Sequence, residues 1–217
     1  MKYAQEKFEI HSTMKRLDQL GMVSGSSGNA SIRIDDQTFV VTPAGVTYDA
    51  LNPEDMVVVD QDLEPMDGDG IPSSESLLHL AIYAARPDVS AIIHTHSVYS
   101  SVHAVTGQSI PPIIDEAILY IGGQIDVSEY GVPGSQELAD YGVAALGDKR
   151  AAIIRNHGMF AVADTLKEAR RVAELVERVA KIHIEATNLG GAIPVPEEGY
   201  KIQRNTYLMR AGMPPED

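Results

Sequence analysis

Cysteine is absent from the 217-residue sequence. Disulfide bonds are therefore excluded, and any metal ion would have to be bound by histidine, aspartate or glutamate. An apolar run long enough to cross a membrane is absent as well. The N-terminal segment MKYAQEKFEIHSTMKRL is charged and helix-periodic, without the apolar core and small-residue cleavage site of a secretory signal. We therefore expect a cytoplasmic protein.

Basic residues are scarce relative to acidic ones. The sequence has 17 lysines and arginines against 31 aspartates and glutamates, which gives a formal net charge of −14. Because binding to nucleic-acid phosphates depends chiefly on lysine and arginine, this balance argues against a nucleic-acid partner. Small anions are not excluded, since backbone N–H groups and hydroxyls can hold a phosphate in a local pocket. We expect neither nucleic acid nor a membrane as a partner.

Linker-like tracts, charge blocks and internal repeats are also absent. We therefore predict a single domain over residues 1–217, with a C-terminal tail from about residue 192. The hydrophobic content of 44% and the charged content of 22% lie in the ordinary globular range, so the chain should bury a sizeable core.

Apolar periodicity predicts an α/β fold in which helices cover a sheet. Helices are expected where apolar residues recur at helical spacing, at 3–20, 73–86, 135–147 and 165–189. Short strands are expected within 24–34, 38–45, 55–60, 89–96 and 150–158. Ser73 or Ser74 is expected as the N-cap of the second helix, and Thr165 with Glu168 as a capping box for the last one.

The stretch AIIHTHSVYS places two histidines at the end of an apolar strand. Because alternate side chains of a strand point to the same face, His94 and His96 would lie side by side, with Thr95 pointing away. Such a pair is half of a metal site, although ordinary core histidines explain it about equally well.

His157 ends another apolar strand and is a candidate third ligand. Three histidines with one open position are typical of catalytic zinc, and nickel, cobalt, manganese or iron would also fit. We interpret the remaining histidines as structural or exposed: His11, His79, His103 and His183.

Three short polar segments have both a structural and a functional interpretation. SSE, residues 73–75, is an ordinary helix start, but its hydroxyls and N–H groups could hold a phosphate, and Glu75 could act as a base near a metal. SGSSGNAS, residues 24–31, suits a loop that approaches an anion, but most such runs are turns. TPAG, residues 42–45, is likewise a turn by default.

Five motifs follow one another along the chain in the order SGNAS, TPAG, SSE, HTH and NHG. In this combination the sequence, over about residues 5–190, resembles the class II aldolase/adducin head family, and most closely its fuculose-1-phosphate aldolase branch. The resemblance implies a three-layer α/β/α domain with a largely antiparallel central sheet. It also implies a homotetramer with active sites at the subunit interfaces. The implied activity is zinc-dependent cleavage of a ketose 1-phosphate into dihydroxyacetone phosphate and an aldehyde.

The resemblance also implies roles for individual residues. His94, His96 and His157 match the zinc ligands, and Glu75 matches the catalytic carboxylate. The positions that match the phosphate-binding loops are Gly28, Asn29, Gly45, Ser73 and Ser74. Ala44 stands where the aldolases of the family often have threonine, so a contact there would come from the backbone or from Gly45.

The sequence departs from the aldolase pattern in the segment IIDEAILYIGG. Glu116 stands where fuculose-type aldolases have the tyrosine that protonates the aldehyde oxygen, with Asp115 beside it and Tyr120 four residues later. We therefore keep Glu116 and Tyr120 as candidate catalytic residues, with a solvated helix start as the alternative. We interpret Tyr200 and Tyr207, in the C-terminal tail, as packing anchors.

Other activities of the same family remain open at this point. The site could serve a sugar-acid phosphate decarboxylase or a pentulose-phosphate 4-epimerase, because both reactions use a stabilised enolate. An adducin-like assembly module without catalysis is the least favoured alternative, because all three histidines and Glu75 are retained.

Overall fold

The computed structural model describes residues 2–67 and 70–216, and its centre is a seven-stranded sheet with the strand order β4-β3-β2-β1-β5-β7-β6. All paired strands are antiparallel. Their bounds are Asn29–Arg33 (β1), Phe39–Val41 (β2), Val57–Val59 (β3), Pro65–Asp67 (β4), Ala91–Thr95 (β5), Ala151–Ile154 (β6) and Gly158–Ala163 (β7). The strands predicted from sequence are confirmed, whereas β4 and β7 were not predicted.

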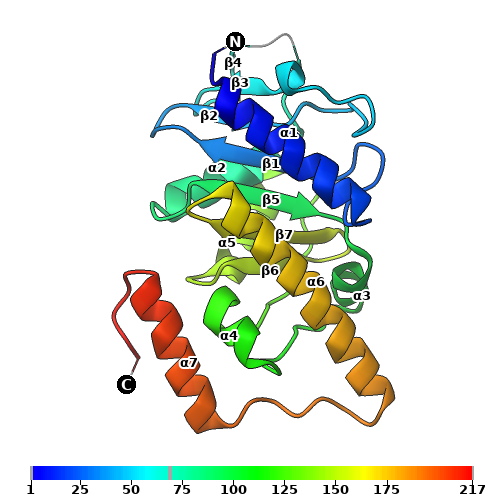
Figure 1. The fold of residues 1–217 in the computed structure, drawn as a ribbon, viewed down its shortest axis with the longest axis vertical. Coiled ribbons are helices and arrows are strands. Elements are labelled where there is room, and N and C mark those ends of the chain that lie inside the picture. Colours follow the sequence, from blue (N-terminus) through cyan, green and yellow to red (C-terminus); the bar gives the residue numbers. More distant parts are fainter. Residues whose placement is uncertain (1, 68–69, 217) are drawn as a thin grey trace.

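Helices cover both faces of this sheet (Figure 1). One face packs against α1, α3, α4 and α6, and the other packs against α2 and α5. The helix bounds are Ala4–Gln19 (α1), Ser76–Ala85 (α2), Val98–Thr106 (α3), Asp115–Ile121 (α4), Gln136–Leu146 (α5), Leu166–Asn188 (α6) and Glu197–Arg210 (α7). The three-layer α/β/α architecture expected from the resemblance is therefore confirmed.

The strand sequences explain the two cores. Because successive strand residues point to opposite faces, the apolar run of β3 serves both layers. Val57 and Val59 pack with α2 and α5, whereas Val58 packs with α1 and its neighbours. The same division occurs in β5, where Ile92 and Ile93 belong to different cores. Continuous apolar strands are thus what a doubly covered sheet requires.

The predicted N-cap residue is confirmed for α6 and is wrong for α2. Thr165 accepts a hydrogen bond from the Glu168 backbone N–H at 3.3 Å, which fixes the start of α6. The expectation for α2 is wrong, because its N-cap is Glu75 and not Ser73 or Ser74. Ser73 instead belongs to the preceding turn, in which its carbonyl accepts from the backbone N–H of Ser76.

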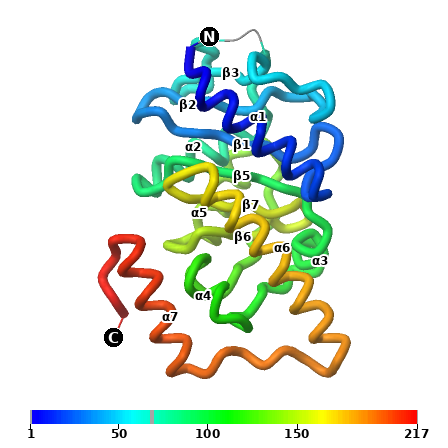
Figure 2. The backbone as a smooth tube through the Cα atoms, in the orientation of Figure 1, coloured from blue at the N-terminus to red at the C-terminus, as the bar shows by residue number. Residues whose placement is uncertain are grey.

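The chain continues beyond α6 into α7, which lies beside α4 (Figure 2). Tyr207 of α7 is only 2% exposed and donates to the Asp148 carbonyl at 2.7 Å. Arg204 donates to the Gly122 carbonyl at 2.8 Å. The interpretation of Tyr207 as a packing anchor is confirmed, although a helix in this tail was not predicted. Within residues 2–67 and 70–216, no helix has the length and apolarity needed to cross a membrane.

The hairpin between β6 and β7 passes close to the end of β5. Its turn contains Asn156, whose φ of 56° is left-handed, and His157. A Cβ at Gly158 would overlap the Thr95 carbonyl oxygen and would lie 2.9 Å from the His96 ring. Only glycine lets the turn approach β5 this closely.

We predict that Gly158→Ala lowers the free energy of unfolding by about 1–3 kcal/mol, because the added methyl group must push β7 away from β5. Urea unfolding of the metal-free protein measures this change. Gly21→Asn is the matched control, because Gly21 has open space around it and asparagine tolerates its φ of 68°. Equal stability of the two variants would contradict the close approach.

Candidate functional site

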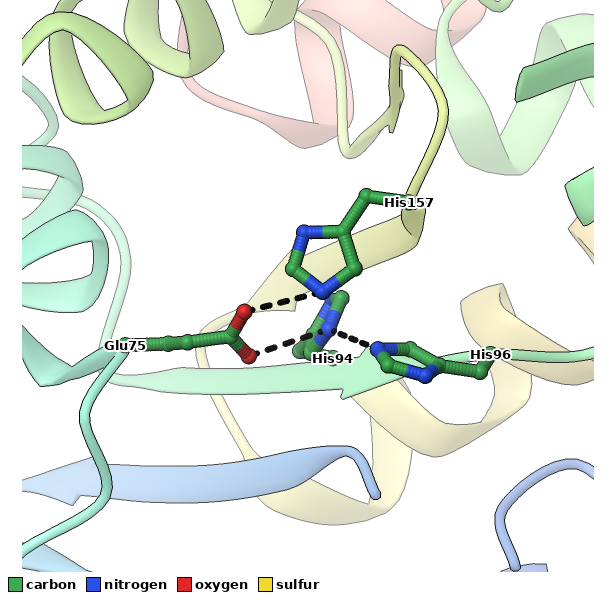
Figure 3. Close-up of side chains that lie close together, drawn as sticks. All are labelled: Glu75, His94, His96 and His157. Carbon is green, nitrogen blue, oxygen red and sulfur yellow. Dashed lines mark hydrogen bonds and ion pairs between the residues drawn. The ribbon is translucent and has the colours of Figure 1, made fainter. Parts of the chain in front are cut away.

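Four side chains that could bind a metal converge at one end of β5, as Figure 3 shows. They are Glu75, His94, His96 and His157, and their ligand atoms all lie within 4.8 Å of one another. The ring centroids of the three histidines are 4.7–4.8 Å apart in pairs. The side-by-side arrangement of His94 and His96 predicted from strand alternation is confirmed.

Each histidine reaches the cluster from a different backbone position. His94 is the penultimate residue of β5 and is 1% exposed, and His96 comes one residue after the strand ends. The Nε2 atoms of these two rings are 2.8 Å apart. His157 comes from the β6–β7 turn, as the sequence indicated.

Glu75 lies between two of these rings. One carboxylate oxygen is 3.1 Å from His94 Nε2, and the other is 2.9 Å from His157 Nε2. The first oxygen also accepts a hydrogen bond of 2.6 Å from the Asn29 side-chain amide. Asn29 is held in place because it pairs with His94 across β1 and β5. Two strands and the start of α2 therefore fix the orientation of the carboxylate.

The electrostatics of the cluster favour an ionised Glu75 and a neutral His96. Burial alone would raise the pKa of Glu75, but His94 and His157 more than offset it, so that the pKa lies well below its usual range. Burial, together with repulsion from His94 and His157, lowers the pKa of His96 to about 4. His96 is therefore neutral near pH 7, the state in which an imidazole can bind a metal.

The donor set suits a divalent transition metal. His94 Nδ1 lies 2.9 Å from the Met159 carbonyl, and when Nδ1 donates to it, the lone pair of Nε2 is directed into the cluster. Histidine nitrogens and one carboxylate are ligands that zinc accepts, and nickel, cobalt, manganese and iron accept them too. These four residues could therefore hold a metal ion.

A cavity of about 270 Å³ opens directly beside the cluster. The structure brings together around it all five positions that the resemblance assigns to phosphate: Gly28, Asn29, Gly45, Ser73 and Ser74. Glu75 and His96 also line it, so the cavity and the cluster share a wall. Ala44, the departure from the threonine of many aldolases, faces the same space.

Gly28 is required for this arrangement. Its φ is 78°, and a Cβ there would lie 2.7 Å from Val23 Cγ1 and 2.8 Å from the His94 carbonyl oxygen. A larger residue would push the loop away from the strand that carries His94. Within SGSSGNAS, Gly28 is thus explained by close backbone packing, whereas Gly25 has open space around it.

Glu177 supports the site from a distance, and its contribution was not apparent from the sequence. Its two carboxylate oxygens accept hydrogen bonds of 2.9 Å each from the backbone N–H groups of Tyr99 and Ser100. These N–H groups belong to the first turn of α3, which starts two residues after His96. Such carboxylate contacts stabilise a helix N-terminus, so α6 holds in place the segment that follows the HTH motif.

Glu116 and Tyr120 do not line the cavity of this chain. Both lie on α4, where Glu116 accepts a hydrogen bond of 2.9 Å from Arg178. The Tyr120 ring lies 4.0 Å from the Arg171 guanidinium and 5.6 Å from that of Arg210. These two arginines lower the pKa of the Tyr120 phenol. Catalytic roles for Glu116 and Tyr120 stay predictions.

The sequence also matches a model of a known protein family. The family described as Class II Aldolase and Adducin N-terminal domain matches residues 8–184. The chain belongs to this family. The matched region contains the whole cluster and every residue that lines the cavity.

Several class II aldolases are similar to this chain over most of its length. A 5-deoxy-D-ribulose 1-phosphate aldolase from Bacillus thuringiensis is 34% identical over 89% of this chain and 91% of its own. An L-fuculose phosphate aldolase from Escherichia coli is 30% identical over 86% of each chain. A solved L-fuculose 1-phosphate aldolase superposes with a TM-score of 0.90 at 32% identity, covering 95% of this chain and 98% of its own. These similarities support an aldolase with a metal-binding site.

We predict that His96→Ala lowers the affinity for the first equivalent of metal by more than about 100-fold, because a ligand is lost and not merely an outer hydrogen-bond partner. Metal content after dialysis against buffered zinc checks this. His11→Gln is the matched control, because His11 contacts the Leu51 carbonyl at 3.1 Å, outside the cluster. A His96→Ala protein with its full tightly bound complement would remove His96 from the ligand set.

Proposed function

We propose that the protein is a zinc-dependent aldolase that cleaves a deoxy-ketose 1-phosphate into dihydroxyacetone phosphate and an aldehyde. The observation that supports this most strongly is the shared wall between the His/Glu cluster and a polar cavity of about 270 Å³. A phosphate in the cavity would place the carbonyl of the same three-carbon unit beside the cluster. The substrate class follows from relatives described as 5-deoxyribulose 1-phosphate, 5-methylthioribulose 1-phosphate and fuculose phosphate aldolases.

The phosphate end of the substrate would be held by neutral groups. The hydroxyls of Ser73 and Ser74, the Asn29 side chain and the backbone at Gly28 and Gly45 offer donors around one space. No lysine or arginine lines this cavity among the described residues, so backbone and hydroxyl donors would provide the binding. This contact would orient the carbon that reacts, which lies two bonds from the phosphate-bearing carbon.

Zinc would be held by His94, His96 and His157. When bound, it would supply Lewis-acid stabilisation of the negative charge that develops on the substrate carbonyl oxygen. Neutral imidazoles suit this role, and the neutral state of His96 near pH 7 follows from its lowered pKa.

Glu75 would be the proton-transfer group. In the cleavage direction, the C4 hydroxyl gives up its proton to the acid–base group at the aldehyde end, the bond between C3 and C4 breaks and C4 becomes the aldehyde carbon. C3 then takes up a proton to become the hydroxymethyl carbon of dihydroxyacetone phosphate. Glu75 would carry that proton, and in the reverse direction would remove it. Its carboxylate is only 10% exposed and is oriented by Asn29 at 2.6 Å, so it can act at a defined atom.

The aldehyde end would be completed by assembly. We propose a homotetramer with sites at subunit interfaces, as the resemblance to the family implies. Glu116 and Tyr120 lie on α4, outside the cavity of their own chain, and would act only in such an assembly. From an interface, either group could protonate the aldehyde oxygen of a neighbouring site. Because its pKa is lowered, the Tyr120 phenol is a better proton donor than the phenol of an ordinary tyrosine. Glu116 stands at the position where the fuculose-type aldolases have tyrosine.

We predict that zinc-loaded protein exchanges one prochiral hydrogen on the hydroxymethyl carbon of dihydroxyacetone phosphate in deuterium oxide, as followed by NMR. Glu75→Gln should slow this exchange by about 10²–10⁴-fold, the range typical of a lost general base. The assay is made at saturating zinc, so that a change in metal affinity does not contribute. Glu174→Gln, on the exposed side of α6, is the control and should exchange normally.

Exchange by Glu75→Gln within a few-fold of the wild-type rate would exclude Glu75 as the base. If the zinc-loaded wild-type protein gave no exchange, with or without an added aldehyde, the aldolase assignment would fail. Product analysis with phosphorylated sugars and sugar-acid phosphates would then test decarboxylation and epimerisation at the same site.

A further inference from the structure

A second pair of histidines lies outside the site described above, between α3 and α6. His183 Nδ1 is 3.3 Å from His103 Nε2, and the ring centroids are 5.0 Å apart. Neither residue belongs to the His/Glu cluster or lines the cavity beside it. The proposed aldolase mechanism therefore gives this pair no role.

His103 is held as a metal-binding histidine usually is. The residue is 2% exposed, and its Nδ1 lies 2.7 Å from the Gln108 carbonyl oxygen. Because the carbonyl can only accept, the hydrogen of a neutral ring is on Nδ1, and the lone pair of Nε2 faces His183 Nδ1. A backbone carbonyl that fixes the tautomer in this way is the usual outer partner of a histidine ligand.

The space around the pair is small and contains further oxygen donors. A cavity of about 110 Å³ is lined by both histidines and by Gln108 and Asn188, whose side chains carry amide oxygens. Thr106 and Thr187 also line it. The cavity is large enough for one ion and one or two water molecules, since a water occupies about 30 Å³ in the liquid.

The separation of the two nitrogens matches shared coordination. Two histidine nitrogens bound to one tetrahedral zinc at about 2.0–2.1 Å are separated by ~3.3 Å, and the pair is 3.3 Å apart. His183 is partly exposed on α6, so its ring can turn until both lone pairs face one ion. The buried partner, His103, need not move.

We infer that His103 and His183 form a second site for a borderline divalent transition metal, with zinc, nickel and copper(II) as the candidate ions. Water and the amide oxygens of Gln108 or Asn188 would complete the coordination. This site offers two protein nitrogens, whereas the His/Glu cluster offers three nitrogens and a carboxylate. It therefore binds its ion more weakly than the cluster does. A bound ion would link α6 to the helix that follows the HTH motif.

Zinc binding to the metal-free full chain tests this inference. Equilibrium dialysis over a range of buffered free zinc should give two equivalents per chain for the wild type, the second at least 10-fold weaker than the first. His183→Gln should retain the first equivalent and lose the second. His11→Gln, which removes a histidine elsewhere, should retain both, and His96→Ala should retain the weaker one. Unfolding of each metal-free variant by urea checks that the fold is intact.

A spectroscopic measurement makes the result independent of the variants. In wild-type protein labelled with ¹⁵N-histidine, the second equivalent of zinc should shift the Nε2 resonance of His103, whereas the first should not. A single equivalent in the wild type would overturn the inference. Retention of the second equivalent by His183→Gln, or a second equivalent that leaves His103 Nε2 unshifted, would overturn it as well, because the ion would then be bound by other surface groups.

Discussion

The contact of the Glu75 carboxylate with His94 and His157 is the constraint on which the site depends. The carboxylate is only 10% exposed, and a buried charge of this kind is tolerated only when it is paired and hydrogen-bonded. Its partners come from three separate segments: the end of β5, the β6–β7 turn and, through Asn29, the start of β1. These segments must therefore be in register before the site exists.

Backbone packing provides that register. The antiparallel pairing of Asn29 with His94 and of His94 with Phe160 places β1 and β7 on either side of β5. The two neighbouring loops can approach because Gly28 and Gly158 leave no side chain in the way. After β5, the chain enters α3, and Glu177 of α6 accepts hydrogen bonds from the first turn of that helix. These bonds fix the direction in which the chain leaves His96. The functional groups thus rest on a rigid sheet, with a long helix behind it.

Much of this arrangement follows from local sequence patterns, and the remainder depends on contacts between distant segments. Strand alternation correctly placed His94 beside His96, and the helical periods of α1, α5 and α6 were read correctly because each spans several turns. The helices α3 and α4 are short, with nine and seven residues, so their periods are weak. The contacts of Glu177 with α3, 77 and 78 residues away, and of His183 with His103, 80 residues away, have no local signal at all. The prediction of Ser73 as an N-cap was wrong, because the preference of serine for that position does not show that the residue instead belongs to a turn beside the cavity.

On the proposed mechanism, the two ends of the substrate would be recognised by different means. The His/Glu cluster and the cavity beside it, where the phosphate end would bind, are both built from residues of one chain. The opposite end would depend on α4, where Glu116 and Tyr120 are paired with arginines of α6 and α7. Changes at these two positions would leave the ligand set of the His/Glu cluster intact, because neither residue belongs to it. If Glu116 or Tyr120 acts at the aldehyde end, substitutions on α4 would change the specificity for the aldehyde while the metal ligands stay the same.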